Sequence, residues 1–213
     1  TLPKKAVQES VFNAVALLSK ESAVRATGKM QKASQAMNGV ELVPGALDVL
    51  SVSKAPVPLD TSGKIESDLS VRLDYRFLDL RNPRSQALFK IKSKMVKAIV
   101  EFFDENGFTA IQTPKLTVAG VESGAELFTV DYFGRPAYLS QSPQIYKQMM
   151  VLAGFEKVYE IGSVFRAEKS HTTRHVTEFM GVDFEMGFIK SFEEPMQVAE
   201  ELVKFIVAFL QKE

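Results

Sequence analysis

The chain contains no cysteine among its 213 residues. This absence excludes disulfide bonds, thiolate nucleophiles and zinc sites built on cysteine, and it is compatible with a reducing compartment. No apolar run approaches the roughly 20 residues that a membrane-spanning helix needs. The first ten residues, TLPKKAVQES, also lack the charged-then-apolar order of a secretory signal. We therefore expect no membrane segment and a cytoplasmic location.

The chain also lacks a net charge, because 26 basic side chains balance 26 acidic ones. No global electrostatic field therefore favours a polyanionic partner, and any contact with nucleic acid must come from local patches. Apolar residues, by contrast, are abundant: 46% of the chain is hydrophobic, and 16 residues are Phe. This composition and length predict a globular protein of one domain plus a smaller piece.

Turn signals divide the first sixty residues into short β-like stretches. ESAVRATGKM and ALDVLSVS favour strands and are separated by Asn-Gly and Pro-Gly dipeptides. We expect two or three strands of a small barrel or sandwich. The segment 54–70 contains Pro56, Pro58 and Gly63, so it cannot sustain a helix and is predicted to link two domains.

Helical periodicity follows this linker. Apolar residues recur at intervals of three and four, and the helix is predicted to end before Gly107; the set is Leu88, Ile91, Met95, Ala98, Ile99 and Phe102. The stretch FTAIQTP then predicts a strand that ends at Pro114, because proline cannot donate to a strand ladder.

Two further helices are predicted. The first has Ser142 as its N-cap and Pro143 at its first position, and it ends before Gly154. The last helix opens with a capping box from Ser191 to Glu194 and has one apolar face, formed by Val198, Leu202, Phe205, Ile206 and Phe209.

Between these helices, two alternating stretches flank a loop that holds both histidines of the chain. Alternate side chains of an extended chain share one face. One predicted face is apolar and consists of Tyr159, Ile161, Phe165, Ala167, Met180, Val182, Phe184, Met186 and Phe188. The opposite face consists of Glu160, Gly162, Val164, Arg166, Glu168, Phe179, Gly181, Asp183, Glu185 and Gly187. Paired as an antiparallel hairpin, the strands would bury the first face under helices.

Two interpretations of the second face remain open. Charged residues on a strand commonly form a solvated surface with cross-strand ion pairs. Glycines opposite a bulky apolar row favour the other interpretation, a ligand that lies flat on the sheet, because glycine in a strand often marks close approach.

A second cluster lies near the start of the helix that follows Pro143. Gln144 and Lys147 are three residues apart and share one face, where free N–H groups and the helix dipole favour an anion such as a carboxylate. The alternative is a surface helix with an incidental lysine.

Together these stretches resemble the class II aminoacyl-tRNA synthetases, most closely the aspartyl enzymes of archaeal and eukaryotic type. The resemblance runs from about Arg72 to the end of the chain. It is carried by RLDYRFLDLR, by GFTAIQTPKL after the long helix (the family's motif 1), by VESGAELF, by YLSQSPQIYKQ and by VYEIGSVFRAEKSHTTRHVTEFMGVDFEM (motif 2). Residues 1–60 match more loosely and are similar to the last strands of an anticodon-binding OB barrel.

The resemblance implies an α+β fold, an antiparallel sheet flanked by helices and preceded by a partial OB-type β-barrel. The expected domains are a partial anticodon-binding domain at 1–60, a linker or hinge at 61–80, and the N-terminal part of the catalytic domain at 81–213. A homodimer that forms through motif 1 is also expected.

The implied reaction has two steps. Aspartate is activated by ATP to aspartyl-adenylate with loss of pyrophosphate, and the aspartyl group is then transferred to tRNA(Asp). Catalysis would consist mostly of positioning and charge neutralisation around the α-phosphate. Mg²⁺ is expected on the ATP phosphates, with its ligands beyond residue 213.

The motif 2 residues are expected on the nucleotide. Arg166 matches the catalytic arginine that bridges the α-phosphate and the attacking carboxylate, a task that suits its planar fork of donors. Glu168 matches an acid near the adenosine, and Phe179 the aromatic residue on which adenine stacks. Arg174 and His175 match loop residues that reach the outer phosphates, and this loop should also touch the acceptor end of the tRNA.

Five residues are expected around the amino acid. Lys147 would pair with the side-chain carboxylate of aspartate, with Gln144 and Ser142 beside it. Glu122 and Asp183 match acids placed for the α-ammonium group. Asparagine would leave a buried cation unpaired at Lys147, and Asp183, where asparaginyl enzymes are expected to carry Glu, also favours aspartate.

Motif 3, a glycine-rich strand and helix with a second catalytic arginine, is absent from these residues. The favoured hypothesis is therefore a fragment of a complete enzyme. One alternative is an asparaginyl-tRNA synthetase. Another is a synthetase-like protein without catalysis that binds adenylate or RNA as a regulator. A third is an ATP-dependent enzyme that amidates aspartate, although such enzymes lack an anticodon-binding domain.

Overall fold

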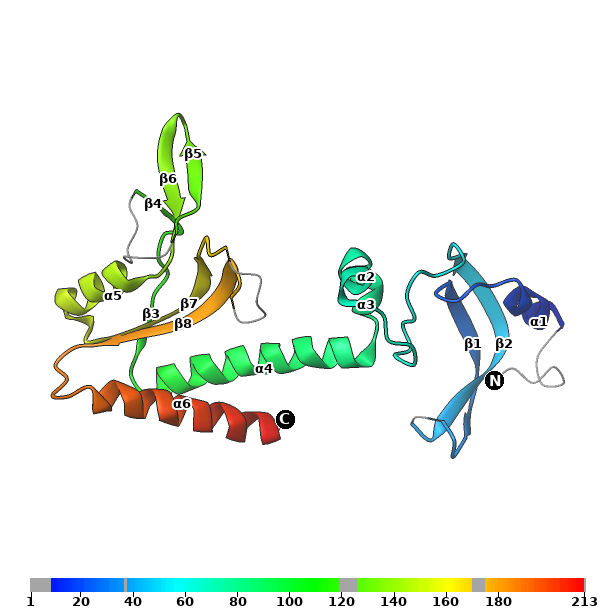
Figure 1. Cartoon of the computed structure of the whole chain (residues 1–213). Coiled ribbons are helices and arrows are strands. Elements are labelled where there is room, and N and C mark those ends of the chain that lie inside the picture. The colour runs from blue at the N-terminus through cyan, green and yellow to red at the C-terminus, as the bar shows by residue number, and fades with distance from the viewer. Residues whose placement is uncertain (1–8, 37, 119–125, 170–174, 213) are drawn as a thin grey trace. The chain divides into compact units, whose positions relative to one another are not determined.

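The computed structural model describes residues 9–36, 38–118, 126–169 and 175–212. The chain forms two compact units, residues 1–88 and 89–213. Figure 1 shows their elements, of which α4 (Pro83–Glu105) begins in the first unit and continues in the second. The predicted division into domains at 60 and 80 stays a prediction.

The first unit contains the predicted pair of strands. β1 (Ala23–Lys32) and β2 (Val40–Ser51) pair antiparallel, and a register shift lies between Thr27 and Gly28. Within the described residues this is a two-stranded sheet, and no barrel closes around it. The helix α1 (Glu9–Ala16) was not predicted; it precedes both of the stretches that were interpreted as β-like.

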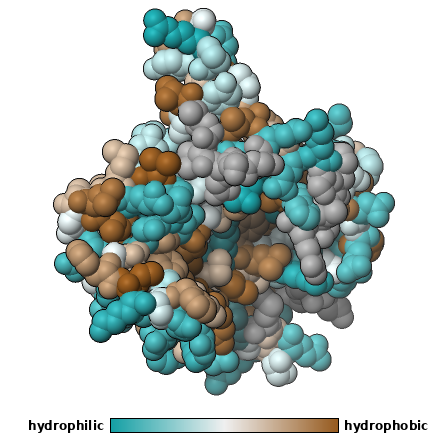
Figure 2. Space-filling view, turned by 60° about the vertical axis from the view of Figure 1, so that its left-hand side comes forward, coloured by the Kyte–Doolittle hydropathy of each residue, from teal (hydrophilic) through white to brown (hydrophobic). Residues whose placement is uncertain are grey.

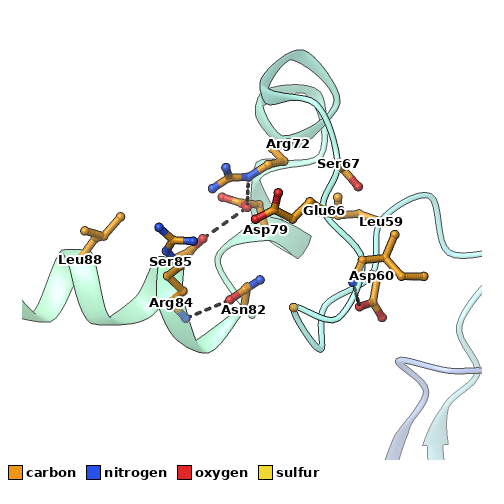
Figure 3. A pocket seen from close by; sticks show the side chains of 12 residues that line it. Leu59, Asp60, Glu66, Ser67, Arg72, Asp79, Asn82, Arg84, Ser85 and Leu88 are labelled. Carbon is orange, nitrogen blue, oxygen red and sulfur yellow. Dashed lines mark hydrogen bonds and ion pairs between the residues drawn. The ribbon is translucent and has the colours of Figure 1, made fainter.

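Two short helices follow in the segment predicted as a hinge, α2 (Leu69–Asp74) and α3 (Arg76–Asp79). Asp79 is 2% exposed and accepts a hydrogen bond from Arg72 Nε at 2.7 Å. Arg76 also pairs with Asp79. Ser85 Oγ donates to Asp79 at 3.3 Å, as Figure 3 shows. Two arginines therefore compensate one buried carboxylate, and the stretch RLDYRFLDLR holds the start of α4 in place.

A cavity of about 340 Å³ lies beside this cluster, with Leu59, Glu66 and Asn82 among its lining residues (Figure 3). Among the predicted site residues that the structure describes, none lines it.

The second unit contains two three-stranded sheets, in the orders β3-β7-β8 and β4-β6-β5. The strands are β3 (Thr109–Ala110), β4 (Leu116–Thr117), β5 (Thr129–Tyr132), β6 (Arg135–Leu139), β7 (Lys157–Phe165) and β8 (Glu178–Met186). The helical elements are α4, α5 (Gln144–Met150), a π-helical turn η1 (Val151–Phe155) and α6 (Glu193–Lys212). Figure 1 shows α4 and α6 together on one side of β7 and β8.

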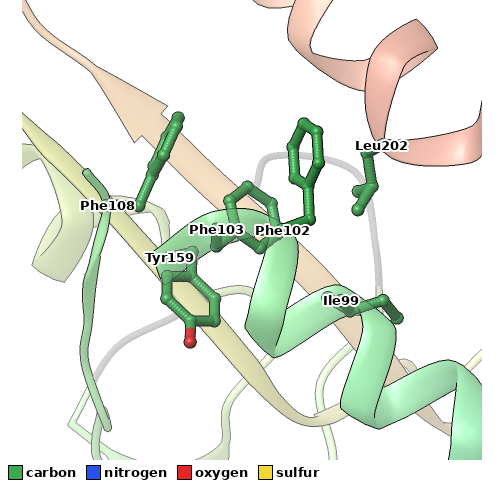
Figure 4. Packing of buried hydrophobic residues seen from close by; sticks show 6 residues of the cluster. All are labelled: Ile99, Phe102, Phe103, Phe108, Tyr159 and Leu202. Atoms are coloured by element: carbon green, nitrogen blue, oxygen red, sulfur yellow. The ribbon is translucent and has the colours of Figure 1, made fainter. Parts of the chain in front are cut away.

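The core of this unit is an aromatic cluster between α4, α6 and the sheet (Figure 4). Phe103 is fully buried, and its ring stacks on Tyr159 with 4.5 Å between centroids. The Tyr159 hydroxyl donates to Asp104 at 3.2 Å, and burial, together with this carboxylate, raises the pKa of Tyr159 above its usual 10.0. The predicted apolar faces of α4 and α6 are confirmed at Ile99, Phe102 and Leu202.

The apolar row of β8 is only partly covered. Phe184 and Met186 pack against the core, but Met180 is 51% exposed, Val182 41% and Phe188 88%. The prediction that helices bury the whole row is therefore wrong for the described residues. Figure 2 shows that apolar and polar residues are interspersed over the side of the molecule that it draws.

The helix ends differ from prediction in detail. α4 ends as expected, with Gly107 at φ +74°, and η1 ends beyond Gly154 at φ 96°. The capping box at Ser191 does not form: the Glu194 carboxylate accepts from the Lys190 N–H at 2.8 Å, and α6 begins two residues later than Ser191. Among the described helices, none is long and apolar enough to cross a membrane.

Candidate active site

The register of β7 and β8 creates the face on which the predicted site residues lie. Glu160 stands opposite Asp183, Gly162 opposite Gly181, and Val164 opposite Phe179. These residues share one side of the sheet, and Tyr159 and Phe184 point to the core on the other. The predicted alternation is therefore confirmed, and it places the carboxylates and the glycines on the face opposite α4 and α6.

One end of this face is built around Lys147 of α5. The side chain of Lys147 is 3% exposed, and its Nζ lies 2.5 Å from Asp183 Oδ1 and 3.3 Å from Glu185 Oε2. Lys147 Nζ also donates to the backbone oxygen of Phe184 at 3.2 Å. An ammonium group this buried is stabilised only by such compensation, so it forms a fixed positive centre beneath two carboxylates.

The start of α5 completes this end. Gln144 Nε2 donates to Glu185 Oε2 at 3.0 Å, and the Gln144 N–H donates to Ser142 Oγ at 3.2 Å. The Ser142 hydroxyl therefore caps the helix as expected from a serine, although Pro143, one residue later, occupies the N-cap position. The structure brings Ser142, Gln144, Lys147 and Asp183 together, and it adds Glu185.

The other end of the face carries the motif 2 residues. The Arg166 N–H donates to the backbone oxygen of Thr177 at 3.0 Å, which extends the pairing by one residue beyond β7. The Arg166 guanidinium carbon lies 5.5 Å from the centroid of the Phe179 ring. A depression of about 530 Å³ is lined by Arg166, Glu168, His175, Val176 and Phe179. Four residues predicted on the nucleotide are thus grouped around one open depression, with an aromatic face and a cation side by side.

The two glycines between these ends differ in what lies above them. An added Cβ at Gly162 would meet Lys115 Nζ at 3.0 Å and Glu160 Oε1 at 3.1 Å. At Gly181 the nearest atoms would be 3.8 Å away, which is ordinary contact. A Cβ at Gly181 would thus fit without strain, whereas the space above Gly162 is taken by an ion pair of the protein itself. That a ligand lies on this face stays a prediction.

That ion pair was missed by the sequence reasoning. Glu160 is 4% exposed and accepts from Lys115 Nζ at 3.0 Å, from the Thr113 N–H at 2.9 Å and from Thr113 Oγ1 at 2.8 Å. Strand alternation placed Glu160 on the site face, but Thr113 and Lys115 come from the segment after β3, and no periodicity links that segment to β7.

Two predicted site residues, Glu122 and Arg174, lie outside the described residues. Elsewhere, in the part of the chain that the structure describes, no three His, Asp or Glu residues are grouped as a metal site would require. No ligand for Mg²⁺ is therefore assigned to this chain.

The fold and the two-ended face define the class of protein. The family model of class II tRNA synthetases (D, K and N) matches residues 68–213, and the chain belongs to this family. The match includes both strands of the site face, α5 and the cluster around Asp79.

Particular relatives are aspartate ligases. The chain is 49% identical over 213 residues to an aspartate–tRNA(Asp/Asn) ligase of Methanopyrus kandleri, and 44% identical over 212 residues to an aspartate–tRNA(Asp) ligase of Pyrococcus abyssi. All of this chain is covered in both comparisons, but only 49% and 48% of the relatives. The chain thus spans about half the length of the curated relatives that it matches.

Solved structures agree on the fold. An asparaginyl-tRNA synthetase from Pyrococcus horikoshii, complexed with asparaginyl-adenylate, superposes with a TM-score of 0.89 at 33% identity, over 99% of this chain and 48% of that one. A putative aspartyl-tRNA synthetase from Leishmania major superposes with a TM-score of 0.85 at 31% identity, over 96% of this chain and 42% of that one. The predicted fold class is therefore confirmed.

Proposed function

We propose that the protein containing this chain is an aspartate–tRNA ligase, which activates aspartate with ATP and transfers it to tRNA(Asp). The observation that carries the proposal is the order of charges along one sheet face. A buried ammonium group lies at one end, and an arginine beside an aromatic ring lies at the other. The identities of 49% and 44% to curated aspartate ligases support the same conclusion.

Lys147 would select the amino acid. The side-chain carboxylate of aspartate would approach Lys147 Nζ, with Gln144 and Ser142 as neighbouring hydrogen-bond groups, and Asp183 would turn toward the α-ammonium group. Glu122 would act with Asp183 on that ammonium group, as the family resemblance implies. A neutral amide at the same place would gain less from a buried cation, which favours aspartate over asparagine.

Arg166 would promote the first chemical step. An α-carboxylate oxygen of aspartate attacks the α-phosphorus of ATP, the bond from that phosphorus to the bridging oxygen breaks, and pyrophosphate leaves. Arg166 would hold the attacking carboxylate and the α-phosphate together, while Phe179 stacks on adenine. Glu168 would contact the adenosine, and His175 and Arg174 the outer phosphates.

In the second step a ribose hydroxyl of tRNA(Asp) attacks the carbonyl carbon of the adenylate, and AMP leaves.

ATP would bind with Mg²⁺, whose ligands are expected outside this chain, and no step above depends on a metal ligand. The predicted homodimer draws support from α4: Leu88 is 61% exposed and Ile91 51%, so part of its apolar stripe is available to a partner. Cytoplasmic location stays a prediction.

The test is aspartate-dependent exchange of labelled pyrophosphate into ATP by the full-length protein, with asparagine as the control. Exchange with aspartate and little with asparagine is expected. Exchange with asparagine alone would favour an asparaginyl enzyme, and no exchange with either amino acid would favour a regulator without catalysis. Either of these two results would overturn the proposal.

A further inference from the structure

The site face holds a buried carboxylate to which no substrate contact has been assigned. Both oxygens of Glu160 accept hydrogen bonds, Oε1 from the Thr113 N–H and Lys115 Nζ, and Oε2 from the Thr113 hydroxyl. The side chain of Glu160 is 5% exposed, whereas that of Lys115 is 29% exposed. Glu160 is therefore held in place by Thr113 and Lys115. Lys115 is the more exposed member of the pair.

The position of the pair ties it to the site. Glu160 and Asp183 face each other across β7 and β8, and both line a small depression together with Pro143, Gly162, Val164 and Gly181. The Lys115 ammonium reaches the space above Gly162, where an added Cβ would lie 3.0 Å from Lys115 Nζ. The pair thus lies between the amino-acid end and the nucleotide end of the face.

The negative charges on this face indicate what Lys115 contributes. Asp183, Glu185 and Glu160 bring three negative charges to the face, and Lys147 compensates only part of them. Without Lys115, the buried charge of Glu160 would stand uncompensated next to Asp183. An aspartate substrate, which carries a net negative charge, would then meet like charge at close range, where the low dielectric strengthens repulsion.

We propose that Lys115 and Glu160 are a positioning pair that sets the charge of the amino acid accepted by this face. Lys115 neutralises Glu160 and so lets the face take an anionic amino acid, and Glu160, anchored on Thr113, holds Lys115 above Gly162. This inference rests on the proposed aspartate activity, because aspartate is the anionic substrate.

The experiment compares Lys115→Met with the double variant Lys115→Met/Glu160→Gln in the full-length protein, by pyrophosphate exchange. Lys115→Met should raise the KM for aspartate about tenfold or more, and leave the KM for ATP within about twofold. The double variant should recover most of the affinity for aspartate, because it removes the uncompensated charge, and the amide oxygen that replaces the carboxylate can still accept from the Thr113 N–H. Lys115→Arg, which keeps the charge, should stay near wild type.

A matched control is Lys157→Met. Lys157 lies on the same strand as Glu160, but it points to the opposite face and donates to the Asn106 carbonyl at 3.4 Å. Its replacement should leave both KM values unchanged. Thermal unfolding of every variant separates loss of fold from loss of affinity, since a misfolded variant would lose ATP and aspartate binding together.

The outcomes distinguish the inference from the proposed function. If wild type shows no aspartate-dependent exchange, the proposed function fails. If wild type is active but Lys115→Met changes both KM values equally, or if the double variant is no better than Lys115→Met, the pair has a purely structural role and the inference is overturned.

Discussion

Lys147 Nζ lies 2.5 Å from Asp183 Oδ1, and the two residues come from α5 and β8, 36 positions apart in the chain. The side chain of Lys147 is 3% exposed, whereas that of Asp183 is 37% exposed. The cation is therefore held inside the protein, and its carboxylate partner reaches the open face. Under the proposed function, a substrate carboxylate would approach this cation from the side that Asp183 occupies.

Replacing Lys147 by Met should abolish activation of aspartate. The variant leaves Asp183 and Glu185 facing each other without their shared cation, and the substrate carboxylate loses its partner. We expect aspartate-dependent exchange to fall by about 100-fold or more. Lys204→Met on α6 is the control, because the Lys204 side chain is 71% exposed and pairs with Glu200 one turn away, outside the candidate site. Exchange near the wild-type rate in Lys147→Met would contradict the assignment.

Arg166→Ala should abolish adenylate formation and leave the fold intact. In the proposed mechanism Arg166 contributes positive charge where negative charge accumulates, so a loss of about 100- to 1,000-fold in exchange rate is expected. Arg166→Lys should retain part of the activity, since it keeps the charge but loses the planar fork. Arg135→Ala on the exposed hairpin of β5 and β6 serves as the control. A Lys variant no better than the Ala variant would mean that the fork geometry, and not the charge, is required.

Phe103→Ala should destabilise the second unit strongly. Phe103 is fully buried and its ring contacts Phe102, Phe108, Tyr159 and Phe184. Removing a ring from such a core costs about 3–5 kcal/mol. Phe103→Leu, which keeps most of the volume, should cost about 1.5 kcal/mol or less. Urea unfolding followed by circular dichroism measures both, and equal losses would argue against packing as the cause.

Asp79 should make stability depend on acid pH. The hydrogen bond from Arg72, with the positive charges of Arg72 and Arg76, holds the pKa of Asp79 below its usual 3.8. Because the pKa of Asp79 is lower in the folded than in the unfolded protein, the ionised carboxylate stabilises the fold at pH values above 3.8. This stabilisation is lost as the pH falls through the pKa that Asp79 has in the folded protein.

Asp79→Asn should remove this acid-side dependence and lower the thermal midpoint at neutral pH. Thermal unfolding from neutral pH to below 3.8 measures the effect. Ser85→Ala is the matched control, because the Ser85 hydroxyl lowers the pKa of Asp79 less than the arginines do, and both arginines remain. An Asp79→Asn variant with an unchanged pH profile would show that the pairs with the arginines do not contribute to stability.

The face of β7 and β8 was predictable because strand geometry is strictly periodic. Alternation alone placed Asp183 and Glu185 beside Gly181, and the register shows them there. Glu185 was not assigned a role, yet its shared face with Asp183 was a usable signal. The apolar stripes of α4 and α6 were predictable for the same reason, since helical periodicity marks the buried side.

Contacts between distant segments were not predictable in this way. Thr113 and Lys115 meet Glu160 across 47 and 45 positions of sequence, and a lysine after a proline carries no sign of its partner. The burial of the β8 side chains Met180 and Val182 was likewise overestimated, because the identity of an apolar residue does not show which residues pack against it.

The sequence by itself determined the main helices of the second unit, the two faces of the central strand pair and, through its motifs, the family; the hairpin of β5 and β6 was not predicted. These properties are local or periodic and are encoded in neighbouring residues. Only the tertiary structure decided that Asp183 neutralises Lys147 and that Lys115 fills the space above Gly162, because an ion pair depends on three-dimensional distance and not on the order of residues.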